Sequence, residues 1–172
     1  MGLLSFLRDK KTAQLSQSTV SGVGKDLFDD WAAMTEEQGG HYSALTMSKN
    51  VHGVGLTFRC RTRDMQKMIS LCISEKADKY FFELGKKYKV RLQFENSIVI
   101  YAYMRAYKQR HATIVDIMDE FIHNIFDSDK LKLQYLGDNG KKITMKFSLK
   151  GSTPAINSTI ARTRQQKEKI NS

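Results

Sequence analysis

The residues with the clearest chemical potential in this sequence are cations that alternate with apolar residues along short runs. In residues 54–61, Arg59 and Arg61 alternate with Phe58 and Cys60, and runs near residues 90, 131 and 145 repeat the pattern. Alternation with a period of two is typical of a strand with one buried and one solvated face. If these strands join one sheet, its open face is positively charged and suited to an acidic partner.

A further run adds aromatic side chains to this set. Tyr101, Tyr103 and Arg105 alternate with apolar residues within residues 98–106. If the two tyrosines point to the open face, they can stack on bases, as in RNA-binding proteins that use a sheet face. If they point the other way, they belong to the core, and the sequence leaves both orientations open.

The candidate nucleic-acid-binding residues combine these strand positions with cations near the C-terminus. They are Arg59, Arg61, Lys89, Arg91, Tyr101, Tyr103, Arg105, Lys130, Lys132, Lys146, Lys150, Arg162, Arg164, Lys167 and Lys169. Cations at such positions also keep an exposed sheet face soluble and deter pairing between sheet edges, which is the alternative interpretation.

Signatures of catalysis are absent from the sequence. It contains no G-x-S-x-G, no H-E-x-x-H and no G-x-x-x-x-G-K-[ST] motif, and its four histidines show no spacing typical of a metal site. Cys60 and Cys72 lie among apolar residues and are expected to be free, buried thiols. We therefore predict a non-enzymatic protein with no cofactor, no metal and no small-molecule substrate.

The charge is unevenly distributed along the 172 residues. The formal net charge is +10, and residues 141–172 hold eight Lys/Arg against one acidic residue, Glu168. A basic C-terminal arm commonly attracts phosphate or anionic lipid, although it can also act as a solubilising tail. No run approaches the roughly 18 apolar residues of a membrane span, so a cytoplasmic location is expected.

The elements that must position these residues follow a repeated order of helix and hairpin. Apolar stripes with helical spacing predict helices over residues 25–37, about 62–88 and 113–126. Each is followed by two alternating runs, which predict hairpins over residues 42–61, 89–106 and 130–149.

The predicted fold class is α+β. It consists of an antiparallel sheet of about six strands from three helix–hairpin units, with the helices packed on one face and a flexible basic C-terminal tail. The predicted organisation is an N-terminal segment and linker over 1–24, a single α+β domain over 25–150, and the basic tail over 151–172.

The first residues form a separate amphipathic start. Leu3, Leu4, Phe6 and Leu7 are followed by three cations, a composition that suits contact with a partner or a membrane surface. This segment supports an alternative hypothesis, in which the protein is an adaptor or assembly component that binds an acidic protein or a membrane.

The leading hypothesis is nucleic-acid binding through the basic sheet face and the basic tail. The sequence does not distinguish DNA, RNA and an acidic protein as partners, and it does not determine the oligomeric state or the biological pathway. It also leaves open whether the three helix–hairpin units form one continuous sheet.

Overall fold

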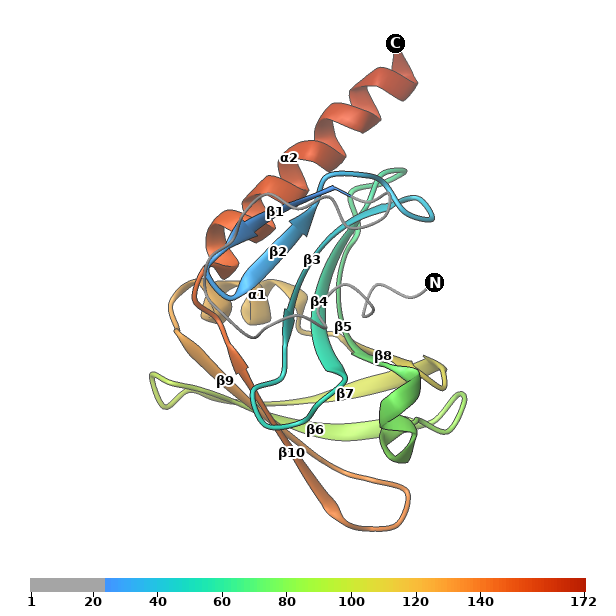
Figure 1. Cartoon of the computed structure of the whole chain (residues 1–172), viewed down its shortest axis with the longest axis vertical. Helices are drawn as coiled ribbons and strands as arrows, with labels where there is room; N and C mark the ends of the chain where they lie inside the picture. Colours follow the sequence, from blue (N-terminus) through green and yellow to red (C-terminus); the bar gives the residue numbers. More distant parts are fainter. Residues whose placement is uncertain (1–23) are drawn as a thin grey trace.

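Strands dominate the computed structural model, which describes residues 24–172 (Figure 1). The strands are β1 Lys25–Phe28, β2 Trp31–Met34, β3 His41–Met47, β4 Val54–Arg61, β5 Lys67–Ile73, β6 Lys87–Phe94, β7 Val99–Lys108, β8 His111–Val115, β9 Lys130–Leu136 and β10 Lys142–Ser148. The helices are the 3₁₀ helix η2 Glu75–Tyr80, α1 Met118–Phe126 and α2 Ser152–Asn171.

The ten strands form one sheet in which every neighbouring pair is antiparallel. Their order is β1-β2-β3-β4-β5-β8-β7-β6-β9-β10. The sheet is strongly curved, so that β6 and β7 run across the direction of β3, β4 and β5 in Figure 1. The predicted α+β sheet of about six strands is therefore wrong, and the fold is a single, larger sheet with two α-helices.

Curvature brings β10 back to the turn that follows β3. Ser48 and Phe147 form an isolated antiparallel bridge, and the Lys49 amide donates to the Lys146 carbonyl at 2.7 Å. The Asn50 side chain accepts from the Lys146 amide at 2.7 Å and donates to the Thr144 carbonyl at 2.9 Å. These bonds satisfy part of the β10 edge, which would otherwise present unpaired backbone groups.

The core lies on the concave side of the curved sheet. Phe58, Met104 and Leu133 are fully buried from three separate strands, and Phe121 of α1 and Ile156 of α2 join the same cluster. Burying a side chain of this size contributes about 1.5–3 kcal/mol. Burial of every second side chain of these strands in the common core therefore fixes the register of the strands.

The predicted helix over residues 25–37 is wrong, because this segment is the β1–β2 hairpin. Asp29 turns the chain with a φ of 48°, a region that Asp tolerates better than most residues. Trp31 is 1% exposed, and its indole Nε1 donates to the Ser148 carbonyl at 3.1 Å. The apolar residues that suggested a helical stripe instead pack a short strand pair against the rest of the fold.

The predicted helix over residues 62–88 is also wrong, except that Glu75–Tyr80 forms the short 3₁₀ helix η2. Residues 62–66 form a tight turn, in which the Arg61 amide donates to the Gln66 carbonyl at 2.9 Å and the Met65 amide donates to the Arg61 carbonyl at 2.8 Å. Lys67–Ile73 becomes β5. Its apolar residues fit both a 3.6-residue and a two-residue period, since Ile69, Leu71 and Ile73 also alternate. Pairing with β4 over seven residues favours the strand.

The third predicted helix, over residues 113–126, is only partly helical. His111–Val115 is strand β8, Asp116 has a φ of 68°, and α1 begins at Met118. β8 fills the gap between β5 and β7, so it links the two halves of the sheet.

The basic segment that we predicted to be a flexible tail is the helix α2. Its first turns pack on β2, β3 and β4, where Ala155, Ile156, Thr159 and Thr163 are buried. Gly151 precedes it with a φ of 81°, and a Cβ there would lie 2.0 Å from the Phe28 carbonyl oxygen, so only glycine fits. The C-terminal end of α2 projects beyond the sheet (Figure 1).

No helix within residues 24–172 has both the length and the apolar composition needed to cross a membrane.

Candidate nucleic-acid interface

The outward side of β6 and β7 gathers cations and tyrosines. Directly opposite residues on paired strands share a face, and the register pairs Arg91 with Tyr101, Lys89 with Tyr103 and Lys87 with Arg105. We call these six residues the basic tyrosine face. The residues between them, such as Val90 and Ala102, are buried on the opposite side.

Both tyrosines whose orientation the sequence left open point outward. Tyr101 is 62% exposed and Tyr103 is 50% exposed. The Lys89 ammonium lies 5.7 Å from the centre of the Tyr101 ring, within the range of a cation–π contact. The two rings are therefore available as flat surfaces with a cation beside them.

The cations of the basic tyrosine face are not neutralised within the described chain. Arg91 donates to the side-chain oxygens of Gln93 at 2.8 Å and Gln134 at 3.2 Å, which orients its guanidinium group without removing its charge. Within residues 24–172, no carboxylate forms an ion pair with Lys87, Lys89, Arg91 or Arg105.

A second group of cations surrounds a groove where β9 and β10 meet the β3–β4 turn. The groove has a volume of about 560 Å³. Its five lysines are Lys49, Lys130, Lys132, Lys146 and Lys150, and we call it the lysine groove. Four of these lysines were candidate binding residues, whereas Lys49 was missed because it lies in a turn with no alternating pattern around it.

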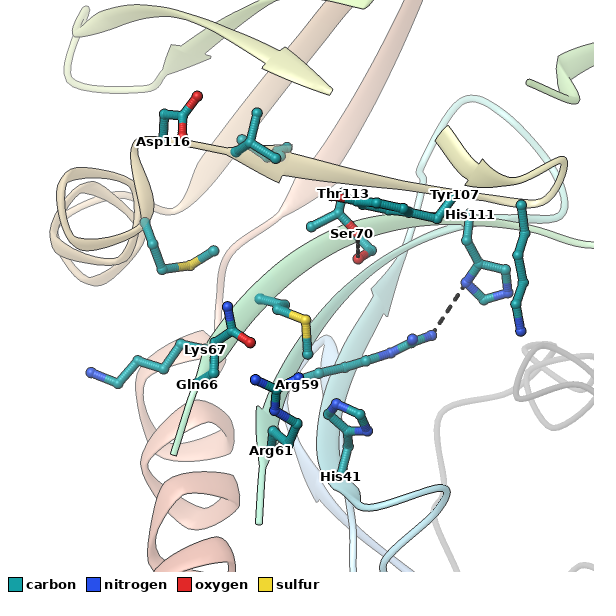
Figure 2. A pocket seen from close by; sticks show the side chains of 15 residues that line it. His41, Arg59, Arg61, Gln66, Lys67, Ser70, Tyr107, His111, Thr113 and Asp116 are labelled. Atoms are coloured by element: carbon teal, nitrogen blue, oxygen red, sulfur yellow. Dashed lines mark hydrogen bonds between the residues drawn. The ribbon is translucent and has the colours of Figure 1, made fainter. Parts of the chain in front are cut away.

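Arg59 and Arg61 lie on β4, on the far side of β5 and β8 from the basic tyrosine face. They line a pocket of about 590 Å³ (Figure 2). Arg61 forms an ion pair with Asp64, which holds the pKa of that carboxyl well below its usual range. The Arg59 guanidinium contacts His111 Nδ1 at 3.3 Å. Both arginines therefore contact other side chains of the same chain, and the Arg61–Asp64 pair lies at the surface.

Cys72 and His111 are direct partners on β5 and β8, and His111 also lines this pocket. The Cys72 Sγ lies 3.4 Å from His111 Nδ1, 3.7 Å from the Arg59 guanidinium and 3.3 Å from the Thr57 hydroxyl. We call these four residues the thiol cluster. Sequence reasoning missed it, because residues 39 positions apart are brought together only by the β5–β8 register.

The electrostatics of the thiol cluster do not favour a cysteine–histidine nucleophile. Burial raises the pKa of the Cys72 thiol, although Arg59 and Thr57 act in the opposite direction. Burial, assisted by Arg59, Lys108 and Arg110, lowers the pKa of His111 to about 4. A protonated thiol beside a neutral imidazole is a structural arrangement, since a reactive cysteine needs a stabilised thiolate.

The cations of the C-terminal segment divide into two groups. Arg162 forms an ion pair with Asp26 and donates to the Met34 carbonyl at 3.4 Å, so it attaches α2 to the β1–β2 hairpin. Arg164, Lys167 and Lys169 lie further along α2, away from the basic tyrosine face. Leu3, Leu4, Phe6 and Leu7 lie outside the described residues.

The residues described, 24–172, contain no group of three or more His, Cys, Asp or Glu side chains that could hold a metal ion. The basic tyrosine face and the lysine groove offer cations, exposed aromatic rings and hydrogen-bond donors on the outer surface of the sheet.

Comparisons with known proteins inform the fold. No protein-family model matches the chain, and no curated protein sequence matches it. Among solved structures, it is similar to the crystal structure of invasion associated protein B from Bartonella henselae. The TM-score is 0.55 and the identity is 16%, over 80% of this chain and 96% of that chain. At this identity the similarity concerns the fold alone.

Proposed function

We propose that this is a non-enzymatic binding protein that holds a single-stranded nucleic acid across the basic tyrosine face. The observation that carries the proposal is the exposed pair Tyr101 and Tyr103, next to cations on the neighbouring strand. Residues two apart on a strand are separated by about 6.6 Å, so the two rings can stack on separate bases of one strand. Base stacking on aromatic side chains contributes about 1–3 kcal/mol per base.

The flanking cations account for the second part of the interaction. Lys89, Arg91 and Arg105 would contact phosphates beside the stacked bases, and each contact adds a salt-dependent contribution to affinity. Stacking needs unpaired bases, so the face favours single strands over duplexes. Nothing on this face reads base edges in a defined pattern, so the sequence preference is expected to be weak.

Fluorescence anisotropy with labelled single- and double-stranded oligonucleotides, measured across a salt series, tests this proposal. For wild type we expect single strands to bind more tightly, with an affinity that falls as salt rises. The double variant Tyr101→Ala/Tyr103→Ala should lose about tenfold or more in affinity, because two stacking surfaces are removed. Tyr107→Ala is the comparison within the same strand, since Tyr107 is 59% exposed beyond Arg105 and lines the pocket in Figure 2, and its loss should be smaller than that of the double variant.

The contribution of α2 is tested by substitution and not by truncation. Because α2 packs on β2, β3 and β4, removing it would expose buried side chains. The variant Arg164→Gln/Lys167→Gln/Lys169→Gln keeps the helix and removes only charge. Binding that is lost in this variant but retained without the two tyrosines would contradict the proposed site.

The adaptor hypothesis depends on the first residues of the chain, which lie outside the described residues, and it stays a prediction. Wild type that binds no oligonucleotide at low salt would make an acidic protein partner the next hypothesis to test.

A further inference from the structure

The lysine groove concentrates charge in a way that the basic tyrosine face does not. Its cations come from separate parts of the chain, namely the β3–β4 turn, β9, β10 and the residues that follow β10. They converge on one depression, whereas the cations of β6 and β7 are spread along two strands. A converging arrangement suits a compact anion better than an extended one.

The backbone of the groove is held by hydrogen bonds between these segments. The Lys49 amide donates to the Lys146 carbonyl at 2.7 Å, and the Asp30 amide donates to the Lys150 carbonyl at 3.3 Å. The Glu95 amide donates to the Lys130 carbonyl at 3.1 Å. The lysine stems therefore start from fixed positions, which lowers the entropy lost when their ammonium groups close on a ligand.

Two of the lysines face each other with like charge. Lys132 and Lys146 are directly opposite in the β9–β10 pair. Like charges at directly opposite positions destabilise a sheet, and their Cβ atoms lie about 4.5–5.5 Å apart. An anion placed between the two ammonium groups would turn this repulsion into attraction.

Carboxylates compensate only part of the charge in the groove. Lys49 pairs with Asp30 at 2.9 Å and Lys130 pairs with Glu95 at 2.6 Å, and the second pair lowers the pKa of Glu95. Asp129 is the third acidic side chain that lines the groove. Among residues 24–172, Lys132, Lys146 and Lys150 form no ion pair with a carboxylate.

The walls of the groove also contain apolar residues. Phe94, Leu131 and Phe147 are among the lining residues, but they are nearly fully buried and belong to the core cluster. The groove thus combines clustered cations with a backbone that is fixed by hydrogen bonds and by the packed core beneath these strands.

We propose that the lysine groove binds a compact chain of phosphate groups, such as a tripolyphosphate moiety. Lys132 and Lys146 hold the central charge, Lys150 extends the contact, and Lys49 and Lys130 close the ends by exchanging part of their bonding with Asp30 and Glu95. The phosphates can belong to a free polyphosphate or to the triphosphorylated end of a nucleic acid. This site is separate from the basic tyrosine face and does not depend on the function proposed there.

Isothermal titration calorimetry with sodium tripolyphosphate, on the full chain in phosphate-free buffer at low salt, tests the proposal. We expect one site per chain for tripolyphosphate and weaker binding of orthophosphate. The variant Lys132→Gln/Lys146→Gln should weaken tripolyphosphate binding about tenfold or more, because two charge-assisted contacts are lost. The control Lys141→Gln/Lys142→Gln removes the same charge from the same hairpin, outside the groove, and should change affinity less than about twofold.

Two results would overturn the groove site. One is the absence of tripolyphosphate binding by wild type at low salt, and the other is equal weakening by the two double variants, which would indicate general charge attraction.

A competition experiment separates the two sources of phosphate. Tighter binding of a 5′-triphosphorylated oligonucleotide than of its 5′-hydroxyl form, lost in Lys132→Gln/Lys146→Gln, would assign the groove to nucleic-acid ends. Equal binding of the two forms with tripolyphosphate still bound would assign it to free polyphosphate.

Discussion

The lysine groove and the thiol cluster are both polar sites on the outer side of the sheet, but they satisfy their polar groups in opposite ways. In the thiol cluster, Arg59, Cys72 and His111 contact one another within 3.3–3.7 Å. In the lysine groove, Lys132 and Lys146 face each other with no ion-pair partner among residues 24–172.

This difference separates structural from functional polarity. Polar groups that satisfy one another inside the fold stabilise it and leave little capacity for a ligand. Like charges that remain unpaired lower the stability of the fold. Such destabilising pairs are retained where they serve a function, such as the binding of an external anion. Arg59 and Arg61 were in the same set of candidate residues as the lysines, but they resemble the first kind of site, since both contact side chains of the same chain.

The largest expected effect concerns the closure that builds the lysine groove. Asn50→Ala removes the side-chain bonds to Lys146 and Thr144, so it should lower the free energy of unfolding by about 1–2 kcal/mol. Urea denaturation measures this change. Asn96→Ala is the control, because Asn96 accepts only a local bond from the Ile98 amide. Equal stability of the two variants would show that the contact between the β3–β4 turn and β10 does not depend on Asn50.

The second prediction concerns acid sensitivity in the thiol cluster. The pKa of His111 is lowered from 6.5 to about 4 in the folded state, so below pH 6.5 the unfolded chain takes up a proton that the folded chain does not. The stability contribution of His111 is therefore complete above about pH 6.5 and is lost as the pH falls towards 4. Because the ring is partly exposed, we expect a loss of about 1 kcal/mol.

Urea denaturation at pH 7 and pH 5 of wild type and His111→Gln isolates this effect, since all other titrating groups are common to both proteins. Wild type should lose more stability than the variant on acidification. His52→Gln is the matched control, since it replaces an exposed histidine outside the thiol cluster. Parallel pH profiles for wild type and His111→Gln would contradict the lowered pKa of the partly buried His111.

The smallest predicted effect is a gain in stability within the lysine groove. Lys132→Gln/Lys146→Gln relieves the repulsion across the β9–β10 pair and should raise the free energy of unfolding by about 0.2–1 kcal/mol at low salt. The gain should disappear near 1 M salt, where the Debye length is about 3 Å. Denaturant titrations at the two salt concentrations measure it. A variant that is less stable than wild type at low salt would show that the two lysines are already compensated.

Local pattern predicted the strands well where one face is buried and the turn is strongly encoded. The runs at 130–136 and 142–148 alternate cleanly around Gly137–Gly140, and β9 and β10 occupy these positions. The helical predictions failed at β1, β2 and β5, because short apolar runs such as Met68–Ile73 fit both periods. Which period prevails depends on the strands available for pairing, which are distant in sequence.

The candidate site was predicted in its composition but not in its arrangement. Alternation correctly indicated which cations lie on the solvated side of β6, β9 and β10, since a two-residue period determines the face of each side chain. It carried no information about Lys49, which reaches the lysine groove only because residue 50 bonds to residues 144 and 146.

The sequence by itself determined that basic side chains lie on the polar sides of several strands, because local alternation needs only neighbouring residues. It left the orientation of Tyr101 and Tyr103 open, and the tertiary structure placed both on the outer face. The tertiary structure alone decided that ten strands form one curved sheet, that Cys72 meets His111, and that lysines from distant segments converge on one groove. Those outcomes depend on register and sheet closure, which are contacts between residues far apart in the chain.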